Sequence, residues 1–189
     1  MKRLFVACLL FLPGMVKAQQ VENFSLLNVV NSENVTLQSY PSCEGMVIIF
    51  TSNDCPYDEY YRARISNLSQ AYNQKVPVLL VNSNSGPADS KEKMVEKAKQ
   101  LKLSIPYLLD KDQVLMSRLD ARKSPEAFLL KNQNGKFTVV YRGAIDDNPQ
   151  VEADVRRNYL RDAIDIMLTN QEIETPEVRA TGCSLKKKN

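Results

Sequence analysis

The sequence predicts an α/β domain in which a central mixed β-sheet is flanked by helices and preceded by an N-terminal β-hairpin. Strands and helices alternate after residue 45, which is typical of a sheet covered by helices. The continuous apolar run at 45–50 has the length and composition of a buried central strand. Asn134-Gly135 separates two further strand-like segments and marks a hairpin turn. A length of 189 residues suits one compact domain.

The elements follow one another without an internal repeat or a linker. Residues 20–40 are expected to form the hairpin, and Pro56 opens an amphipathic helix after the central strand. Further strands are predicted at 76–81, 105–109, 127–131 and 136–141, and helices at 90–101, 114–119 and 151–168. We therefore expect one domain over 20–168, followed by a polar C-terminal tail over 169–189 that carries Cys183.

The first 18 residues have the features of a secretory signal peptide. Lys2 and Arg3 precede an apolar run at 4–12, and Val-Lys-Ala at 16–18 resembles a small-residue cleavage site. The apolar run is short for a membrane span. A secreted or periplasmic location is therefore expected, with no membrane association after cleavage. A short membrane anchor, or a lipid on Cys8, is the alternative.

The charge and composition exclude several classes of function. Removing the three cations of residues 1–18 lowers the number of basic residues from 25 to 22, which equals the number of acidic residues. A net charge of zero gives no support to nucleic-acid binding. The chain has no histidine, which excludes histidine-dependent catalytic triads and histidine-ligated metals. We expect no cofactor and no metal, with Cu(I) binding by thiolates as a minor alternative.

Cys55 is the predicted nucleophile because it lies where the buried strand passes into the helix. Pro56 suits the first helical turn, so Cys55 sits at the helix N-terminus, where free N–H groups and the helix dipole stabilise a thiolate. The carboxylates of Asp54, Asp58 and Glu59 raise the pKa of such a thiol, so we expect it to be moderately acidic. A buried, inert cysteine is the alternative.

Several motifs extend this interpretation when they are taken as an ordered set. They are VIIFT (47–51), NDCPY (53–57), YLLD (107–110), SPEAF (124–128), YRGAIDDN (141–148) and GCSLK (182–186). Together they make the chain resemble the redoxin family, also called the alkyl hydroperoxide reductase and thiol-specific antioxidant family, within the thioredoxin superfamily. It is most similar to the peroxiredoxin-like branch of that family.

The resemblance implies a thioredoxin-like fold and an oxidoreductase or antioxidant activity. It implies that Cys55 is equivalent to the attacking cysteine and that Pro125 is a cis-proline facing it. It also implies that Ser124 offers its backbone to a bound substrate strand and that Thr51 helps to bind substrate. The implied substrates are a protein disulfide or a small hydroperoxide, with an external thiol as reductant.

The sequence also departs from the family pattern. Asp58 stands where thioredoxin has its second cysteine, so the Cys-x-x-Cys pair is missing. Peroxiredoxins have threonine and proline where this chain has Ser52 and Ile48. These departures leave open a second hypothesis, in which the protein is a catalytically inactive binding module on the same fold.

Cys43, Cys55 and Cys183 are the cysteines outside the signal segment. Their odd number leaves at least one thiol free or reacting with another molecule, and a chain of this length needs no disulfide to form a core. Cys183 is the leading candidate to resolve an oxidised Cys55, because its tail is long enough to reach back. A structural disulfide between Cys183 and Cys43, or a free thiol on the surface, are the alternatives.

Overall fold

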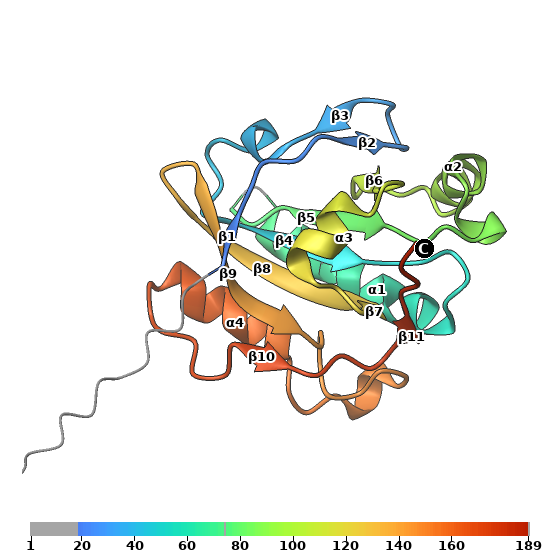
Figure 1. The fold of residues 1–189 in the computed structure, drawn as a ribbon. Helices are drawn as coiled ribbons and strands as arrows, with labels where there is room; N and C mark the ends of the chain where they lie inside the picture. Colours follow the sequence, from blue (N-terminus) through green and yellow to red (C-terminus); the bar gives the residue numbers. More distant parts are fainter. Residues whose placement is uncertain (1–18, 74, 189) are drawn as a thin grey trace, which may run out of the picture.

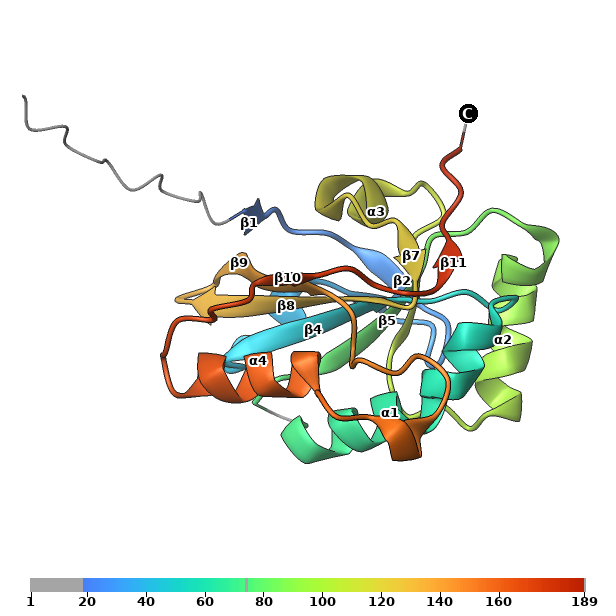
Figure 2. The ribbon, with the colours of Figure 1, turned by 90° about the horizontal axis from the view of Figure 1, so that it is seen from below.

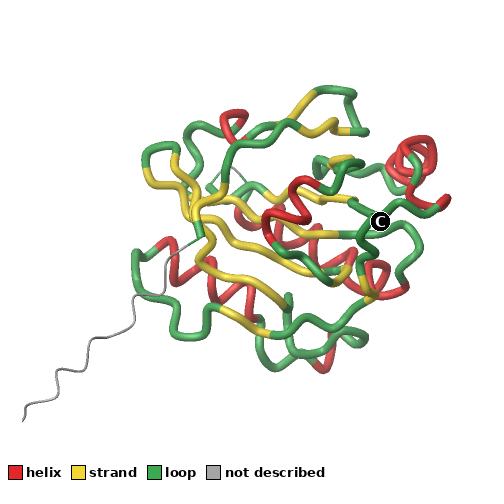
Figure 3. The backbone as a smooth tube through the Cα atoms, viewed as in Figure 1, coloured by secondary structure: helices red, strands yellow, loops and turns green. Residues whose placement is uncertain are grey.

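A nine-stranded mixed sheet forms the centre of the computed structural model, which describes residues 19–73 and 75–188 (Figures 1 and 3). The strands of this sheet are β1 (Gln20–Val21), β2 (Leu26–Asn28), β3 (Asn34–Val35), β4 (Gly45–Phe50), β5 (Val78–Asn82), β6 (Tyr107–Leu109), β8 (Glu126–Gln133), β9 (Lys136–Gly143) and β10 (Glu177–Val178). Two short strands, β7 (Lys123–Ser124) and β11 (Cys183–Ser184), form a separate pair. The helices are α1 (Pro56–Tyr72), α2 (Lys91–Gln100), α3 (Val114–Leu119) and α4 (Tyr159–Leu168), and the 3₁₀ turns are η1 (Leu37–Ser39), η2 (Pro87–Asp89) and η3 (Glu152–Asp154).

The strand order β1-β9-β8-β4-β5-β6-β2-β3, with β10 beside β9, confirms the predicted mixed sheet. Strand β4 pairs in parallel with β5 and antiparallel with β8, and β5 pairs in parallel with β6. All six residues of β4 are buried because both faces of the sheet are covered. The central position of β4 fixes where the chain must leave the sheet to form α1.

The two faces of the sheet contribute to two separate apolar cores. Val47 and Ile49 of β4 pack with α1, α2 and α4, whereas Ile48 and Phe50 pack with α3 and the N-terminal strands. Figure 2 shows α1, α2 and α4 together below the sheet and α3 above it. This division follows from the alternation of side chains along a strand.

The predicted hairpin turn at Asn134-Gly135 is confirmed. It joins β8 to β9, and both residues have positive φ angles, 55° and 83°. Asparagine and glycine tolerate this left-handed conformation better than other residues. The local sequence therefore determines the register of the two longest strands.

The predicted helix over 151–168 is too long at its N-terminal end, because α4 begins at Tyr159. The N–H groups of Val151 and Arg156 bond instead to the side chains of Asn148 and Asp147. Asx side chains that capture backbone N–H groups in this way compete with helical hydrogen bonds. The hairpin predicted over 20–40 covers fewer residues than expected, since β2 pairs with β3 while β1 pairs separately with β9.

The polar segment that follows α4 contains two strands that the sequence did not predict. Strand β10 pairs in parallel with β9, and β11 pairs antiparallel with β7. Gly143 permits the first pairing, because a Cβ atom there would lie 1.6 Å from the carbonyl oxygen of Val178 and its φ is +125°. The C-terminal segment is therefore packed along the domain, which brings Cys183 to the start of α1.

The predicted signal peptide at residues 1–18 lies outside the described residues. Among the residues that are described, no helix has the length and hydropathy needed to cross a membrane.

Candidate functional site

Cys55 and Cys183 form a disulfide between the start of α1 and strand β11. The S–S distance is 2.07 Å and the Cα atoms are 5.9 Å apart. The residues are separated by 128 positions in the sequence. Cys43 is a free, buried cysteine, so the alternative pairing of Cys183 with Cys43 is wrong. The structure thus joins the predicted nucleophile to its predicted redox partner.

Cys55 caps the N-terminus of α1, as its position before Pro56 predicts. Its backbone is extended, with φ −98° and ψ 119°, and its carbonyl accepts a hydrogen bond from the N–H of Asp58 at 3.2 Å. The residue is only 5% exposed. Cys55 nevertheless belongs to neither apolar core. It is covered by the segment to which it is bonded rather than sealed in the interior.

The predicted cis-proline is confirmed. The Ser124–Pro125 peptide bond is cis, and the carbonyl oxygen of Ser124 lies 3.1 Å from the Sγ of Cys55. Ser124 also pairs directly with Cys183 in the β7–β11 ladder. Four of the five predicted site residues therefore meet at one place: Cys55, Cys183, Ser124 and Pro125.

Asp58, which replaces the second cysteine of thioredoxin, is buried behind this cluster. Its Oδ2 accepts hydrogen bonds from the backbone N–H of Ser52 at 3.0 Å and from the hydroxyl of Ser124, whereas its Oδ1 has no hydrogen-bond partner. Burial raises the pKa of this carboxyl to about 6, although the hydrogen bonds from Ser124 and Ser52, the side chain of Thr51 and the positive charge of Lys97 oppose the rise. The site therefore holds a titratable group that responds to pH near neutrality.

A polar network holds the turn between β4 and α1. The buried carboxylate of Asp89 accepts hydrogen bonds from the hydroxyl of Ser52 and from the N–H of Asn53, the latter at 2.7 Å. Tyr107 donates to the side chain of Asn53 at 2.8 Å, and the ammonium group of Lys97 donates to its carbonyl, also at 2.8 Å. These contacts hold the backbone immediately before Cys55 from three elements, η2, β6 and α2.

The profile of the AhpC/TSA family matches residues 18–152. The chain belongs to the AhpC/TSA family. No match was found among curated proteins. The family assignment agrees with the redoxin resemblance inferred from the motifs.

Several solved structures are similar in fold to this AhpC/TSA protein. An uncharacterised conserved protein from Geobacillus kaustophilus is 30% identical, with a TM-score of 0.80 over 90% of this chain and 92% of that one. A hypothetical protein from Sinorhizobium meliloti 1021 is 25% identical, with a TM-score of 0.78 over 92% and 95%. An exposed lipoprotein thioredoxin from Streptococcus pneumoniae is 18% identical, with a TM-score of 0.59 over 76% and 99%. This last likeness confirms the thioredoxin-like fold.

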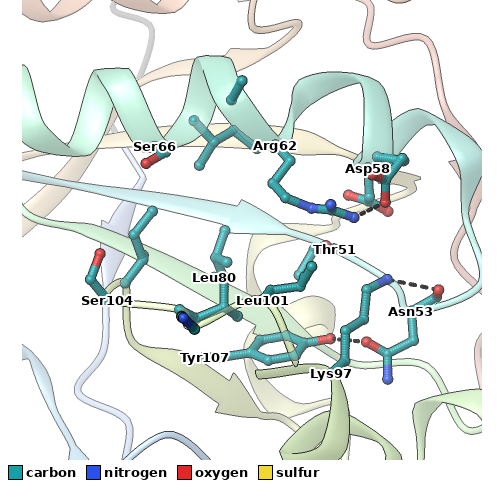
Figure 4. Close-up of a pocket in the computed structure, with 16 residues that line it drawn as sticks. Thr51, Asn53, Asp58, Arg62, Ser66, Leu80, Lys97, Leu101, Ser104 and Tyr107 are labelled. Atoms are coloured by element: carbon teal, nitrogen blue, oxygen red, sulfur yellow. Dashed lines mark hydrogen bonds and ion pairs between the residues drawn. The ribbon is translucent and has the colours of Figure 1, made fainter. Parts of the chain in front are cut away.

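Thr51, the fifth predicted residue, lies apart from the disulfide. Its side chain lines a pocket of about 430 Å³ between α1, α2 and β6, which Cys55 does not line. Figure 4 shows Asp58, Arg62 and Lys97 around Asn53 at one end of this pocket, with Ser66 and Ser104 at the other. Thr51 therefore shares this pocket with Asp58, the carboxyl behind the site, in this AhpC/TSA protein.

The sequence did not identify the residues that hold the turn in this AhpC/TSA protein. Asp89 lies 37 positions from Ser52, and no local pattern links the two. The one available signal was Asn82, a polar residue at the end of the buried strand β5, which donates to Asp89 at 2.7 Å. Polar residues at the carboxyl ends of parallel strands commonly line functional sites.

Cys43 has a different environment. It is 6% exposed and belongs to the apolar core on the α3 face of the sheet. Burial raises the pKa of its thiol, and a hydrogen bond from Asn132 only partly offsets this. A thiol with a raised pKa is a poor nucleophile at neutral pH. The geometry gives Cys43 no part in the site.

Proposed function

We propose that this protein is a thiol–disulfide oxidoreductase in which Cys55 is the nucleophile and Cys183 is the resolving cysteine. The observation that carries the proposal is the Cys55–Cys183 disulfide at the N-terminus of α1, against the carbonyl of Ser124. A sulfur atom at a helix N-terminus is stabilised as a thiolate, both when it attacks and when it leaves. Two cysteines held at bonding distance are also what an exchange cycle requires.

The proposed reaction consists of two thiol–disulfide exchange steps. The Cys55 thiolate attacks one sulfur of a substrate disulfide, and the second substrate sulfur leaves as a thiolate. Cys183 then attacks Cys55, forms the disulfide that the structure shows, and releases the first substrate sulfur. The substrate gains two electrons, which the two cysteines lose, and an external dithiol returns them. The reverse sequence oxidises a substrate dithiol.

Disulfide exchange is favoured over peroxide reduction by the surroundings of Ser52. This residue stands where peroxiredoxins have a threonine, and its hydroxyl is directed to Asp89 rather than to Cys55. Ile48, which replaces their proline, is fully buried in β4. Neither residue is placed to hold a peroxide beside the sulfur. The pair of bonded cysteines also disfavours the inactive binding module.

The test is to compare wild-type protein, Cys55→Ser and Cys43→Ser in insulin-disulfide reduction and in peroxide consumption. We expect Cys55→Ser to lose at least about 100-fold in disulfide reduction, since the thiolate is the nucleophile, and Cys43→Ser to stay within about twofold. Iodoacetamide titration of the reduced protein is expected to give Cys55 a pKa below the ordinary value of about 8.5. Equal, negligible rates in wild type and Cys55→Ser would overturn the proposal.

We also propose that the protein acts outside the cytoplasm. The support is the signal-like segment at 1–18, together with a Cys55–Cys183 disulfide of the kind that persists in oxidising compartments. Mass measurement of the N-terminus of protein recovered from the exported fraction tests this. A chain that keeps Met1 and stays with the cytoplasmic fraction contradicts it.

A further inference from the structure

The C-terminal segment over residues 181–188, here called the strap, lies against the domain in the manner of a bound peptide. Its strand β11 pairs antiparallel with β7, with Cys183 opposite Ser124 and Ser184 opposite Lys123. The pairing continues one residue further, where the N–H of Leu185 donates to the carbonyl of Arg122 at 2.9 Å. Backbone pairing of this kind gives affinity that does not depend on sequence.

The backbone at the outer end of the strap is bonded to one buried side chain of the domain. Gln113, at the start of α3, donates to the carbonyl of Lys186 at 2.8 Å and accepts from the N–H of Lys188 at 2.7 Å. The ion pairs of the strap are at the surface, as between Lys187 and Asp120 at 3.9 Å. Each of the six residues 183–188 is therefore joined to the segment 111–124 by strand pairing, a hydrogen bond or an ion pair.

The position before the cysteine admits only glycine. A Cβ atom on Gly182 would lie 2.3 Å from the carbonyl oxygen of Ser124 and 2.7 Å from its carbon. These are backbone atoms next to the cis Ser124–Pro125 bond, so they cannot turn aside as a flexible side chain would. Any other residue must push the strand away from β7 and its sulfur away from Cys55.

The position two residues after the cysteine requires an apolar side chain. Leu185 is 9% exposed and belongs to the same apolar core as Leu115, Met116 and Leu119 of α3. The residue between, Ser184, is exposed, and its hydroxyl accepts a hydrogen bond only from the ammonium group of Lys123, at 3.2 Å, so the identity of its side chain matters little. The strap residues beside Cys55 therefore follow the sequence pattern glycine, cysteine, any residue, apolar residue, at positions 182–185.

We propose that the surface of β7 on which the strap lies selects extended protein segments in which glycine precedes the reacting cysteine and an apolar residue follows it by two positions. The inference rests on the proposed function of Cys55. The strap and a substrate segment compete for the same backbone groups of β7. Cys183 therefore reaches Cys55 only as the substrate strand departs, which couples resolution of the mixed disulfide to product release.

The probe is a synthetic peptide copying residues 181–188, with its cysteine carried as a mixed disulfide with thionitrobenzoate. Matched peptides carry Gly182→Val or Leu185→Asp. Each peptide is mixed with the reduced full-length Cys183→Ser protein. Cys55 attacks the sulfur of the peptide cysteine and releases the coloured thionitrobenzoate, whose absorbance gives the rate. The resulting mixed disulfide between Cys55 and the peptide persists, because the resolving thiol of Cys183 is absent. We expect the parent peptide to react at least about tenfold faster than either altered peptide, because each change removes one contact of the paired strand.

A second protein variant tests the competition directly. Introducing Leu185→Asp into the Cys183→Ser protein weakens the hold of the strap, so we expect the parent peptide to react severalfold faster. The reaction with the small disulfide of thionitrobenzoate itself needs no strand site, so its change between the two proteins measures general access to Cys55. The rate with the parent peptide is expected to rise by more than this change. Equal rates for all three peptides, with Cys55 still reacting with the small disulfide, overturn the inference and leave the proposed function intact. Failure of Cys55 to react with any disulfide overturns both.

Discussion

Cys43 precedes the central strand β4 in the sequence and Cys55 follows it. The two residues are almost equally buried, at 6% and 5% exposure. Cys43 lies among apolar side chains, and burial raises the pKa of its thiol. Cys55 caps a helix, lies beside a backbone carbonyl and is bonded to a distant cysteine. Burial alone therefore does not separate the two cysteines, whereas the groups around each sulfur do.

The largest expected difference between the two positions is in stability. Cys183→Ser opens a covalent loop closed across 128 positions, so we expect the free energy of unfolding to fall by about 3–5 kcal/mol. Cys43→Ala removes one sulfur atom from a core and is expected to cost about 1 kcal/mol. Urea unfolding with and without a dithiol reductant measures both effects. If reductant leaves the wild-type midpoint unchanged, the cross-link does not stabilise the fold.

Chemical reactivity sharpens the comparison. After reduction under native conditions, we expect Cys43 to react with iodoacetamide at least about 100-fold more slowly than Cys55, because its thiol is buried in an apolar core with a raised pKa. Peptide mass mapping over time gives both rates, and unfolded protein serves as the control in which they should converge. Equal rates in the native protein would remove the distinction.

Asp58 offers a test of the polar surroundings of Cys55. Because its pKa is raised from 3.8 to about 6, the folded state binds a proton that the unfolded state releases between these values. Stability from this group is therefore lost as the pH rises through that window, by about 2–3 kcal/mol in total. We expect Asp58→Asn to lack this loss.

The measurement for Asp58 is the difference in unfolding free energy between wild type and variant at several pH values from about 4 to 7. Asp54→Asn is the matched control, since Asp54 also neighbours Cys55 but is exposed, and surface changes usually stay within about 0.5 kcal/mol. A difference that does not vary with pH contradicts the raised pKa of Asp58.

The smallest expected effect concerns the charges at the outer end of the strap. Lys187→Ala breaks an exposed ion pair with Asp120 and is expected to change the unfolding free energy by less than about 0.5 kcal/mol. Leu185→Ala, two residues away, removes a buried side chain and is expected to cost about 2 kcal/mol. Similar losses for the two variants would show that charge, rather than apolar packing, holds the strap.

The sequence was sufficient to predict the elements around Cys55. The apolar run of β4 and the proline at the first turn of α1 are strong local signals, and both elements begin where they were predicted. The cis bond at Pro125 followed from resemblance to a family, since no local pattern specifies it. The pairing of Cys183 with Cys55 followed instead from the length of the C-terminal tail and the need of an oxidised thiol for a second one. Helix α3 was also predicted with its observed bounds, from Val114 to Leu119.

The elements that were missed depend on contacts distant in sequence. Strands β10 and β11 have two residues each, too few for any periodicity to appear. Asp89 and Tyr107 reach the turn before Cys55 from other loops and strands, and only the folded chain brings them there. The need for glycine at Gly182 comes from the carbonyl of Ser124, 58 positions earlier, and cannot be seen in either local sequence.

The bond from Cys55 to Cys183 also turns most of the domain into a covalent ring. A protease that nicks the ring once, for example at the exposed β8–β9 hairpin tip, produces no separate fragment until the bond is reduced. After reduction, only strand pairing and core packing would join the piece that contains α4 and β10 to the piece that contains β4 and β5. The oxidised protein therefore has a covalent safeguard against the loss of either piece, and the proposed catalytic cycle removes this safeguard each time it reduces the bond.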